Sequence, residues 1–189
     1  MVQESVVIRS HVAGSISEAD IGSIVIVAGW VQKRRDHGGV TFFDLRDASG
    51  LLQVVADPSV HPEVESLKME YCVRVRGTVR SRPEGTENPD LATGLVEVGV
   101  EELTVLSPSG TLPFMIDDRV EVDEQVRLKH RYLDLRRPRM AANLRARSKA
   151  TAAIRRTLDD LGFLEVETPT LMNSTPEGAR DMLVPSRLR

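Results

Sequence analysis

The stretch IVIVAGWVQKRRDHGGVTFFDLRDASGLLQVVA, residues 24–56, decides the fold. It holds three short segments rich in β-branched and aromatic residues, at 24–31, 40–47 and 51–56, and the turn-forming runs DHGG and ASG separate them. Apolar segments bounded by Gly, Asp and Ser are typical of β-strands joined by tight turns. The sequence therefore predicts three consecutive strands.

Two further strands are predicted downstream. Residues 72–80 alternate, with Val73, Val75 and Val79 on one face and polar side chains on the other, which is the pattern of a half-buried strand. The last strand is expected at 95–105.

A short helix is expected at 63–70, between the third and fourth strands. The order strand, strand, strand, helix, strand, strand is that of a small five-stranded Greek-key β-barrel, the OB-fold, which we expect over residues 1–106. A plain β-sandwich has the same periodicity. Barrels of this type bind oligonucleotides on one strand face, so the pattern points to nucleic acid.

The composition is that of a folded chain in a reducing compartment. The 189 residues have a formal net charge of −3 and 41% hydrophobic residues, which is enough for a packed core. Cys72 is the single cysteine, so no intrachain disulfide is expected. No apolar run reaches the ~18 residues of a membrane span, and residues 1–10 lack the features of a secretion signal. We expect a cytoplasmic protein.

Charge is distributed unevenly along the chain. Residues 83–124 contain eleven acidic residues and one basic residue, whereas residues 127–156 contain eleven basic residues and one acidic residue. A near-neutral total therefore does not exclude a polyanionic partner. The alternative is a solvated basic helix beside an acidic linker. The four histidines are scattered singly, and no metal site is predicted.

The second half of the chain predicts a linker and the start of an α+β domain. Residues 107–125 are rich in Pro, Gly and carboxylates and form the expected linker, and 126–189 form the expected second domain. Helices are expected at 124–135 and from Pro138 onward, where an apolar stripe is formed by Ala150, Ile154, either Thr157 or Leu158, and Leu161. A strand is expected at 163–167.

Three features of the barrel suit an unpaired nucleotide. The first strand ends in Lys33, Arg34 and Arg35, the second carries the pair Phe42 and Phe43, and the third carries Gln53. If alternation turns Phe42 outward, its ring can stack on a base while the arginines contact phosphates or base edges. The alternative is that one phenylalanine belongs to the core and the other is incidental. Trp30 is expected in the core.

Six separated motifs resemble bacterial-type aspartyl-tRNA synthetases of class II. They are GWV at 29–31, RRDHGG at 34–39, FDLRD at 43–47, RYLDLR at 131–136, GFLEVETP at 162–169 and STPEGARD at 174–181. Lysyl and asparaginyl relatives share the barrel but usually lack the TPEGARD run. The resemblance implies an OB-fold that grips the anticodon loop and a catalytic domain that uses ATP and Mg²⁺ to form aspartyl adenylate and to aspartylate tRNA(Asp).

The resemblance also assigns roles to individual residues. The anticodon-binding residues that it implies are Arg34, Arg35, Phe42, Gln53, Arg82 and Glu97. Glu177 would hold the ammonium group of L-aspartate, in a loop with Ser174 and Thr175. The helix from Pro138 and the strand that ends at Pro169 resemble motif 1, the homodimer interface of the class.

In family members that also charge tRNA(Asn), the turn after the arginine cluster tends to carry His and a later loop tends to carry Gly. Here these positions are His37 and Gly85, so the resemblance extends to non-discriminating use of tRNA(Asp) and tRNA(Asn). The two tRNAs differ at the third anticodon base, and a smaller loop would no longer reject the third base of tRNA(Asn).

Motifs 2 and 3 of class II synthetases, which contact ATP, are not found in these residues. We therefore expect an N-terminal portion without catalytic residues of its own, which binds no cofactor and forms no adenylate. A free-standing tRNA-binding module and an asparagine-specific relative are the alternatives.

Overall fold

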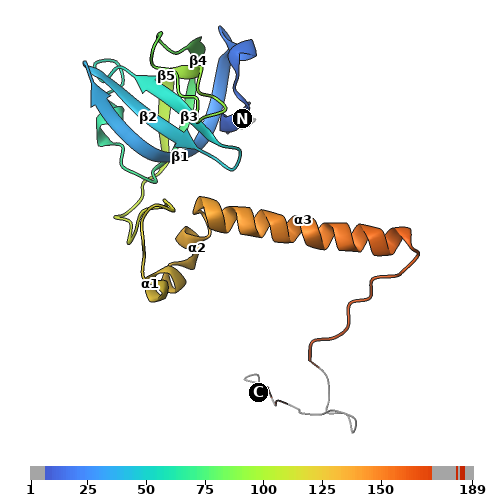
Figure 1. Ribbon diagram of the computed structural model, residues 1–189. Helices are drawn as coiled ribbons and strands as arrows, with labels where there is room; N and C mark the ends of the chain where they lie inside the picture. Colours follow the sequence, from blue (N-terminus) through green and yellow to red (C-terminus); the bar gives the residue numbers. More distant parts are fainter. Residues whose placement is uncertain (1–6, 172–181, 183, 186–189) are drawn as a thin grey trace, which may run out of the picture. The chain divides into compact units, whose positions relative to one another are not determined.

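The computed structural model describes residues 7–171, 182 and 184–185 (Figure 1). The chain divides into two compact units, Met1–Leu112 and Pro113–Arg189, and each is described by itself.

The first unit is a closed five-stranded barrel. Its strands are β1 (Ile24–His37), β2 (Val40–Arg46), β3 (Leu51–Ala56), β4 (Cys72–Ser81) and β5 (Val96–Ser107). The hydrogen-bonded order is β1-β2-β3-β5-β4, and β4 pairs with β1 to complete the ring (Figure 1). This arrangement confirms the OB-fold and sets the sandwich aside.

One junction of the barrel differs from the others. β3 and β5 run parallel and pair only through Val54 with Val98 and Val55 with Gly99, whereas the other neighbouring strands are antiparallel and pair over longer ladders. Parallel pairs need a long connection between the strands, and here the chain passes through β4 before it returns as β5.

The core follows the alternation predicted from sequence. Val73, Val75 and Val79 are at most 1% exposed and point into the barrel, while Arg74, Arg76 and Thr78 point outward. Phe43 is fully buried in the same core. Trp30 was expected there, and that prediction is wrong. It lies between inward-facing neighbours on β1, so its own side chain points outward and is only partly buried.

The predicted helix at 63–70 is a shorter 3₁₀ helix, η3 (Pro62–Ser66). Val64 and Leu67 are 0% and 3% exposed, and their spacing of three residues matches the 3₁₀ period, so both side chains reach the core. Two other 3₁₀ helices, η1 (Ala13–Ser15) and η2 (Glu18–Asp20), precede the barrel.

The described residues of the second unit form three helices, α1 (Glu124–Lys129), α2 (Arg131–Asp134) and α3 (Pro138–Asp160). Asp123 caps α1 by accepting hydrogen bonds from the backbone N–H groups of Gln125 and Val126. The sequence predicted a single helix at 124–135, and that prediction is wrong, because the structure has two helices there. His130, with φ −115° and ψ 46°, leaves the helical region and divides it in two.

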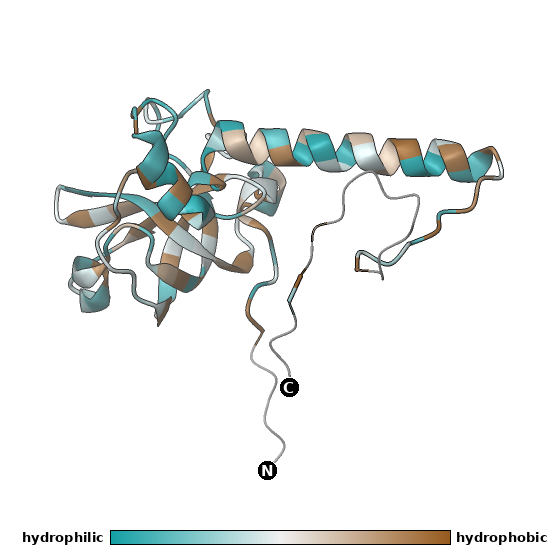
Figure 2. Ribbon diagram, turned by 90° about the horizontal axis from the view of Figure 1, so that it is seen from below, coloured by the Kyte–Doolittle hydropathy of each residue, from teal (hydrophilic) through white to brown (hydrophobic). Residues whose placement is uncertain are grey.

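Helix α3 begins at Pro138, as predicted, and none of its described residues is buried. Hydrophobic and hydrophilic residues are interspersed along it (Figure 2), and Ile154, Leu158 and Leu161 of the predicted stripe are 62%, 43% and 68% exposed. None of the described helices is long and apolar enough to span a membrane.

The prediction of a strand at 163–167 is wrong. These residues have no regular secondary structure, and Phe163, Leu164 and Val166 are exposed. A strand requires a neighbour to complete its hydrogen-bonded ladder, and none of the described segments pairs with these residues. Pro169, the expected interface residue, lies in the same exposed segment.

Candidate nucleic-acid interface

Strand register brings the candidate barrel residues onto one outer face. Residues opposite each other in a ladder point to the same side, so Phe42 shares its side with Arg35 on β1 and Val55 on β3. The next row holds Lys33, Asp44 and Gln53, and continues to Glu97 and Arg80. These side chains together with Gly99, which pairs with Val55, are called the outer face below.

A β-bulge on β1 determines which arginine faces outward. The register shifts between Val31 and Lys33, so the odd-numbered residues point inward before the bulge and outward after it. Arg35 therefore lies opposite Phe42, and Arg34 lies opposite the buried Phe43. Phe42 itself is half-buried on the outer face.

A chain of hydrogen bonds crosses the outer face. The Nη2 of Arg35 donates to Asp44 Oδ1 at 2.8 Å and to Gln53 Oε1 at 3.4 Å. Gln53 Nε2 donates to Glu97 Oε2 at 2.8 Å, and Arg80 Nε donates to Glu97 Oε1 at 2.9 Å. Gln53 and Glu97 are 8% and 2% exposed, so the network is fixed by burial as well as by its bonds.

Arg82 lies next to this network and has an unused donor. It is 8% exposed, and its Nε donates to the carbonyl of Val96 at 3.1 Å. Its buried Nη2 has no hydrogen-bond partner among the described residues. Burial lowers the pKa of Arg82, while the charges of Glu97 and Asp44 act in the opposite direction. A buried donor without a partner is costly, which favours a ligand acceptor at this position.

The electrostatics of the outer face favour an anionic partner. Burial raises the pKa of Asp44, although Arg35, Arg82 and Lys33 each act to lower it. Three cations of the outer face, Lys33, Arg35 and Arg80, and the adjacent Arg82 accompany the carboxylates Asp44 and Glu97. An excess of cations beside a half-buried ring matches the requirements of single-stranded nucleic acid.

Arg34 does not join the network. Its guanidinium donates to Asp36 at 2.9 Å and to the carbonyl of Glu65 at 2.5 Å, and thus connects the end of β1 to η3. The structure therefore separates Arg34 from the other five expected anticodon-binding residues.

His37 and Gly85 lie in exposed turns of the barrel. His37 is the last residue of β1 and precedes a tight turn to Val40. Gly85 has φ +81°, a backbone conformation that strains other residues, and no atom lies within 4 Å of where its Cβ would be. The turn at Gly85 therefore has no side chain at this position and is open to solvent.

Two charged residues of the outer face were missed by the sequence reasoning, Asp44 and Arg80. The period of two along a strand could have found both, because Asp44 is two residues from Phe42 and Arg80 lies on the polar side of the alternating segment 72–80. The expected aspartate-binding residues Ser174, Thr175 and Glu177 lie outside the described residues.

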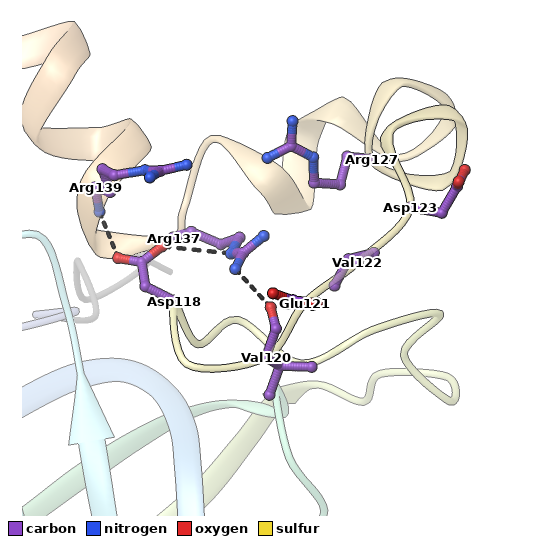
Figure 3. Close-up of a pocket in the computed structure, with 8 residues that line it drawn as sticks. All are labelled: Asp118, Val120, Glu121, Val122, Asp123, Arg127, Arg137 and Arg139. Carbon is purple, nitrogen blue, oxygen red and sulfur yellow. Dashed lines mark hydrogen bonds and ion pairs between the residues drawn. The ribbon is translucent and has the colours of Figure 1, made fainter.

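A second polar cluster lies within the helical unit, around a pocket of about 550 Å³ (Figure 3). Arg137 is 7% exposed, donates to the carbonyls of Asp117 and Val120 at 3.0 and 2.8 Å, and forms an ion pair with Asp118. Asp134 is fully buried beside Arg127, Arg131 and Arg137.

The charges of this second cluster are balanced internally. Three acidic side chains and three arginines line the pocket (Figure 3), and the bonds of Arg137 join residues 117–120 to the start of α3. The cluster therefore fixes the local fold. Arg127 Nε, Arg137 Nε and Asp134 Oδ1 are buried without a hydrogen-bond partner among the described residues, but ion pairs within the cluster compensate their charges. Among the described residues, no group of three or more His, Cys, Asp or Glu side chains could hold a metal ion.

Comparisons with known families agree with this division of the chain. Residues 25–106 match the model of the OB-fold nucleic acid binding domain, and residues 123–189 match that of class II tRNA synthetases (D, K and N).

Related sequences agree as well. The chain is 56% identical over 184 residues to the aspartate–tRNA(Asp/Asn) ligase of Syntrophotalea carbinolica, and 57% identical over 184 residues to that of Moorella thermoacetica. These alignments cover 95% and 96% of this chain but 31% of each relative, so the chain spans about a third of the length of the curated relatives that it matches.

Solved structures share the fold. Asparaginyl-tRNA synthetase from Pyrococcus horikoshii, complexed with asparaginyl-adenylate, has a TM-score of 0.72 at 26% identity, over 85% of this chain and 36% of that one. A structure described as a putative aspartyl-tRNA synthetase from Leishmania major Friedlin has a TM-score of 0.78 at 24% identity, over 92% of this chain and 38% of that one.

Proposed function

Because this chain is related over nearly its whole length to bacterial aspartyl-tRNA synthetases of class II, we propose that its barrel binds the anticodon loop of tRNA(Asp) as part of an aspartate–tRNA ligase. The observation that carries the proposal is the outer face itself. A half-buried ring, a fixed row of donors and acceptors, and an excess of cations lie together on a barrel of the nucleic-acid-binding class.

Each part of the outer face has a defined task in this proposal. The ring of Phe42 stacks on one unpaired base, because an aromatic face accepts any base. Arg35 and Gln53 then meet the edge of that base, with Arg35 held by Asp44 and Gln53 held by Glu97. Because these partners are already fixed, little side-chain freedom is lost when the RNA binds.

Arg82 supplies the contact to a flanking nucleotide. Its unpartnered Nη2 is satisfied when a base or phosphate oxygen of the RNA approaches, so binding removes a cost that the free protein carries. The same cost works against any ligand that lacks an acceptor at this position. Arg82 therefore contributes to specificity as well as to affinity.

The remaining parts of the proposal concern the whole enzyme, in which ATP and Mg²⁺ serve the formation of aspartyl adenylate and aspartate is then transferred to tRNA in the cytoplasm. Glu177, with Ser174 and Thr175, is proposed to hold the substrate aspartate, and α3 with Pro169 to form a homodimer interface. The part of the chain that the structure describes provides no cluster of ligands for Mg²⁺.

We also propose that the enzyme accepts tRNA(Asn). Relatives with 56% and 57% identity are named aspartate–tRNA(Asp/Asn) ligases. Here Gly85 leaves its turn without a side chain, so nothing at that position crowds the third anticodon base. Charging assays with the full-length enzyme should give aspartylation of both tRNAs, and strict rejection of tRNA(Asn) would contradict this part of the proposal.

Anticodon binding itself is tested with this chain alone. Affinities are measured at one salt concentration for tRNA(Asp) and for a matched transcript in which only the central anticodon base is changed. We expect the altered transcript to bind about tenfold more weakly, because the contacts of Arg35 and Gln53 are lost. Equal affinity for both transcripts would show that the barrel does not read the anticodon.

A further inference from the structure

We infer that Arg80 forms a second stacking platform on the outer face, on which a second unpaired base lies beside the base held by Phe42. The inference rests on the proposed RNA-binding function of the barrel and adds to it a residue that the resemblance does not assign. It comes from the way in which the guanidinium of Arg80 lies against Gly99.

The guanidinium of Arg80 lies flat on β5 at Gly99. A Cβ at Gly99 would be 3.5, 3.6 and 3.7 Å from Nη1, Cζ and Nε of Arg80. Because one point is nearly equally distant from three atoms of the planar group, the group presents its flat face to Gly99 and not its edge. Glycine, with no side chain, leaves the space that this orientation requires.

A buried carboxylate holds the guanidinium in this orientation. Glu97 Oε1 accepts from Arg80 Nε at 2.9 Å, and its other oxygen is held by Gln53. The Glu97 side chain is 2% exposed, whereas that of Arg80 is 54% exposed. One face of the guanidinium therefore rests on the strand, and the opposite face is available to solvent and to a base.

The charge of Arg80 argues for stacking over a phosphate contact. Its Nε already donates to Glu97, whose negative charge offsets that of the guanidinium. A planar guanidinium still stacks well on a nucleobase when its edge is occupied by a carboxylate. A phosphate placed beside Glu97 would instead be repelled by that carboxylate.

The spacing of the two platforms suits splayed bases. Phe42 on β2, Val55 on β3 and Gly99 on β5 occupy one transverse row, so Phe42 and Gly99 are two strands apart. Two strand spacings correspond to about 10 Å. This exceeds the ~3.4 Å between neighbouring stacked residues of a nucleic acid strand, so each platform receives its own base.

Replacement of Arg80 by lysine tests the inference, because lysine keeps the charge and can keep the ion pair with Glu97 but has no planar group. The probe is an RNA stem-loop with the tRNA(Asp) anticodon, in which 2-aminopurine replaces one loop base at a time. Its fluorescence is quenched where the base stacks. With the wild-type chain we expect quenching at two loop positions on binding.

The variants separate the two platforms. Phe42→Ala should remove the quenching at one position, and Arg80→Lys should remove it at the other and weaken binding about fivefold or more, with the salt dependence unchanged. Lys68→Ala, which removes an exposed charge elsewhere on the barrel, is the control and should retain both quenched positions. Gly99→Leu, which would displace the guanidinium, should reproduce the effect of Arg80→Lys.

The outcomes distinguish this inference from the proposed function. If Arg80→Lys and Gly99→Leu fold and retain both quenched positions, Arg80 is not a platform, even when Phe42→Ala has its expected effect. A loss of affinity with both signals retained also overturns the inference, because it indicates a phosphate contact. If the wild-type chain binds the stem-loop no better than an RNA duplex, the proposed function itself fails.

Discussion

Arg35 and Phe42 lie directly opposite each other in the β1–β2 ladder, so that a guanidinium and a half-buried ring project side by side from the same face of the barrel. Opposite positions in an antiparallel ladder bring Cβ atoms to within about 5 Å. One unpaired base can therefore meet both groups at once, with its face on the ring and its edge at the arginine.

Removal of the ring should weaken RNA binding. We expect Phe42→Ala to reduce the affinity for tRNA(Asp) by about 1–3 kcal/mol, because the stacking surface is lost, whereas Phe42→Trp should retain most of it. The measurement is a binding titration at fixed salt. Because the ring is half-buried, Phe42→Ala should unfold at a somewhat lower denaturant concentration than the wild type, so binding is measured where both variants are folded. Undiminished affinity of Phe42→Ala would exclude Phe42 from the site.

Loss of the Arg35 guanidinium should affect affinity and specificity together. We expect Arg35→Ala to cost about 1–3 kcal/mol in binding, with the salt dependence nearly unchanged, because the guanidinium meets a base edge and not a phosphate. Discrimination against a changed central anticodon base should also decrease. Lys68→Ala is the matched control, since it removes an exposed charge elsewhere on the barrel. Equal effects of the two substitutions would indicate a general charge effect.

Asp47 should make the stability of the barrel depend on pH. Burial alone would raise its pKa, but hydrogen bonds from Ser49, from the backbone N–H of Ala13 and from Gly50 lower the pKa overall. Its charged form is therefore stabilised in the folded state. This stabilisation is present above the unfolded pKa of about 4 and is lost as the pH falls through the lower folded pKa.

Comparison with Asp47→Asn isolates this contribution. The wild-type chain should be more stable than the variant at about pH 6, and the difference should shrink as the pH falls towards about 3. Urea unfolding of both chains across this range provides the measurement. A difference that stays constant with pH would mean that ionisation of Asp47 does not contribute.

Asp134 should be essential to the helical unit. Removal of one partner from a buried ion-pair cluster typically costs about 3–5 kcal/mol, because the remaining charges lose their compensation. In Asp134→Ala these are the charges of Arg127 and Arg137. Hydrogen exchange should become faster in α2 and at 117–120 but not in the barrel strands. Asp160→Ala, at the exposed end of α3, is the control and should change neither region.

Local periodicity was sufficient for much of the barrel. The alternation at 72–80 correctly placed Val73, Val75 and Val79 in the core, because a strand that is buried on one side has a strict period of two. The same rule failed on β1. The bulge after Val31 reverses the phase, so alternation continued from 24–31 would turn Arg34 outward, whereas the structure turns Arg35 outward beside Phe42.

The remaining errors arose where distant partners decide the structure. The hydrogen bond between Gln53 and Glu97 joins residues 44 positions apart, and the position of Arg80 on Gly99 depends on the same register. The segment 163–167 has the composition of a strand, but composition cannot supply the neighbouring strand that such a segment needs. Pairing between strands, and not the pattern within one strand, completes the outer face.

In the proposed complex, the two-residue junction between β3 and β5 would link RNA binding to the stability of the barrel. Gln53 on β3 and Glu97 on β5 lie on opposite sides of this junction and are joined by a buried hydrogen bond. A nucleotide that contacts both residues would stabilise the barrel at the β3–β5 junction, where the strand pairing is shortest. Bound RNA should therefore slow amide hydrogen exchange in β3 and β5 more than in the hairpin formed by β1 and β2.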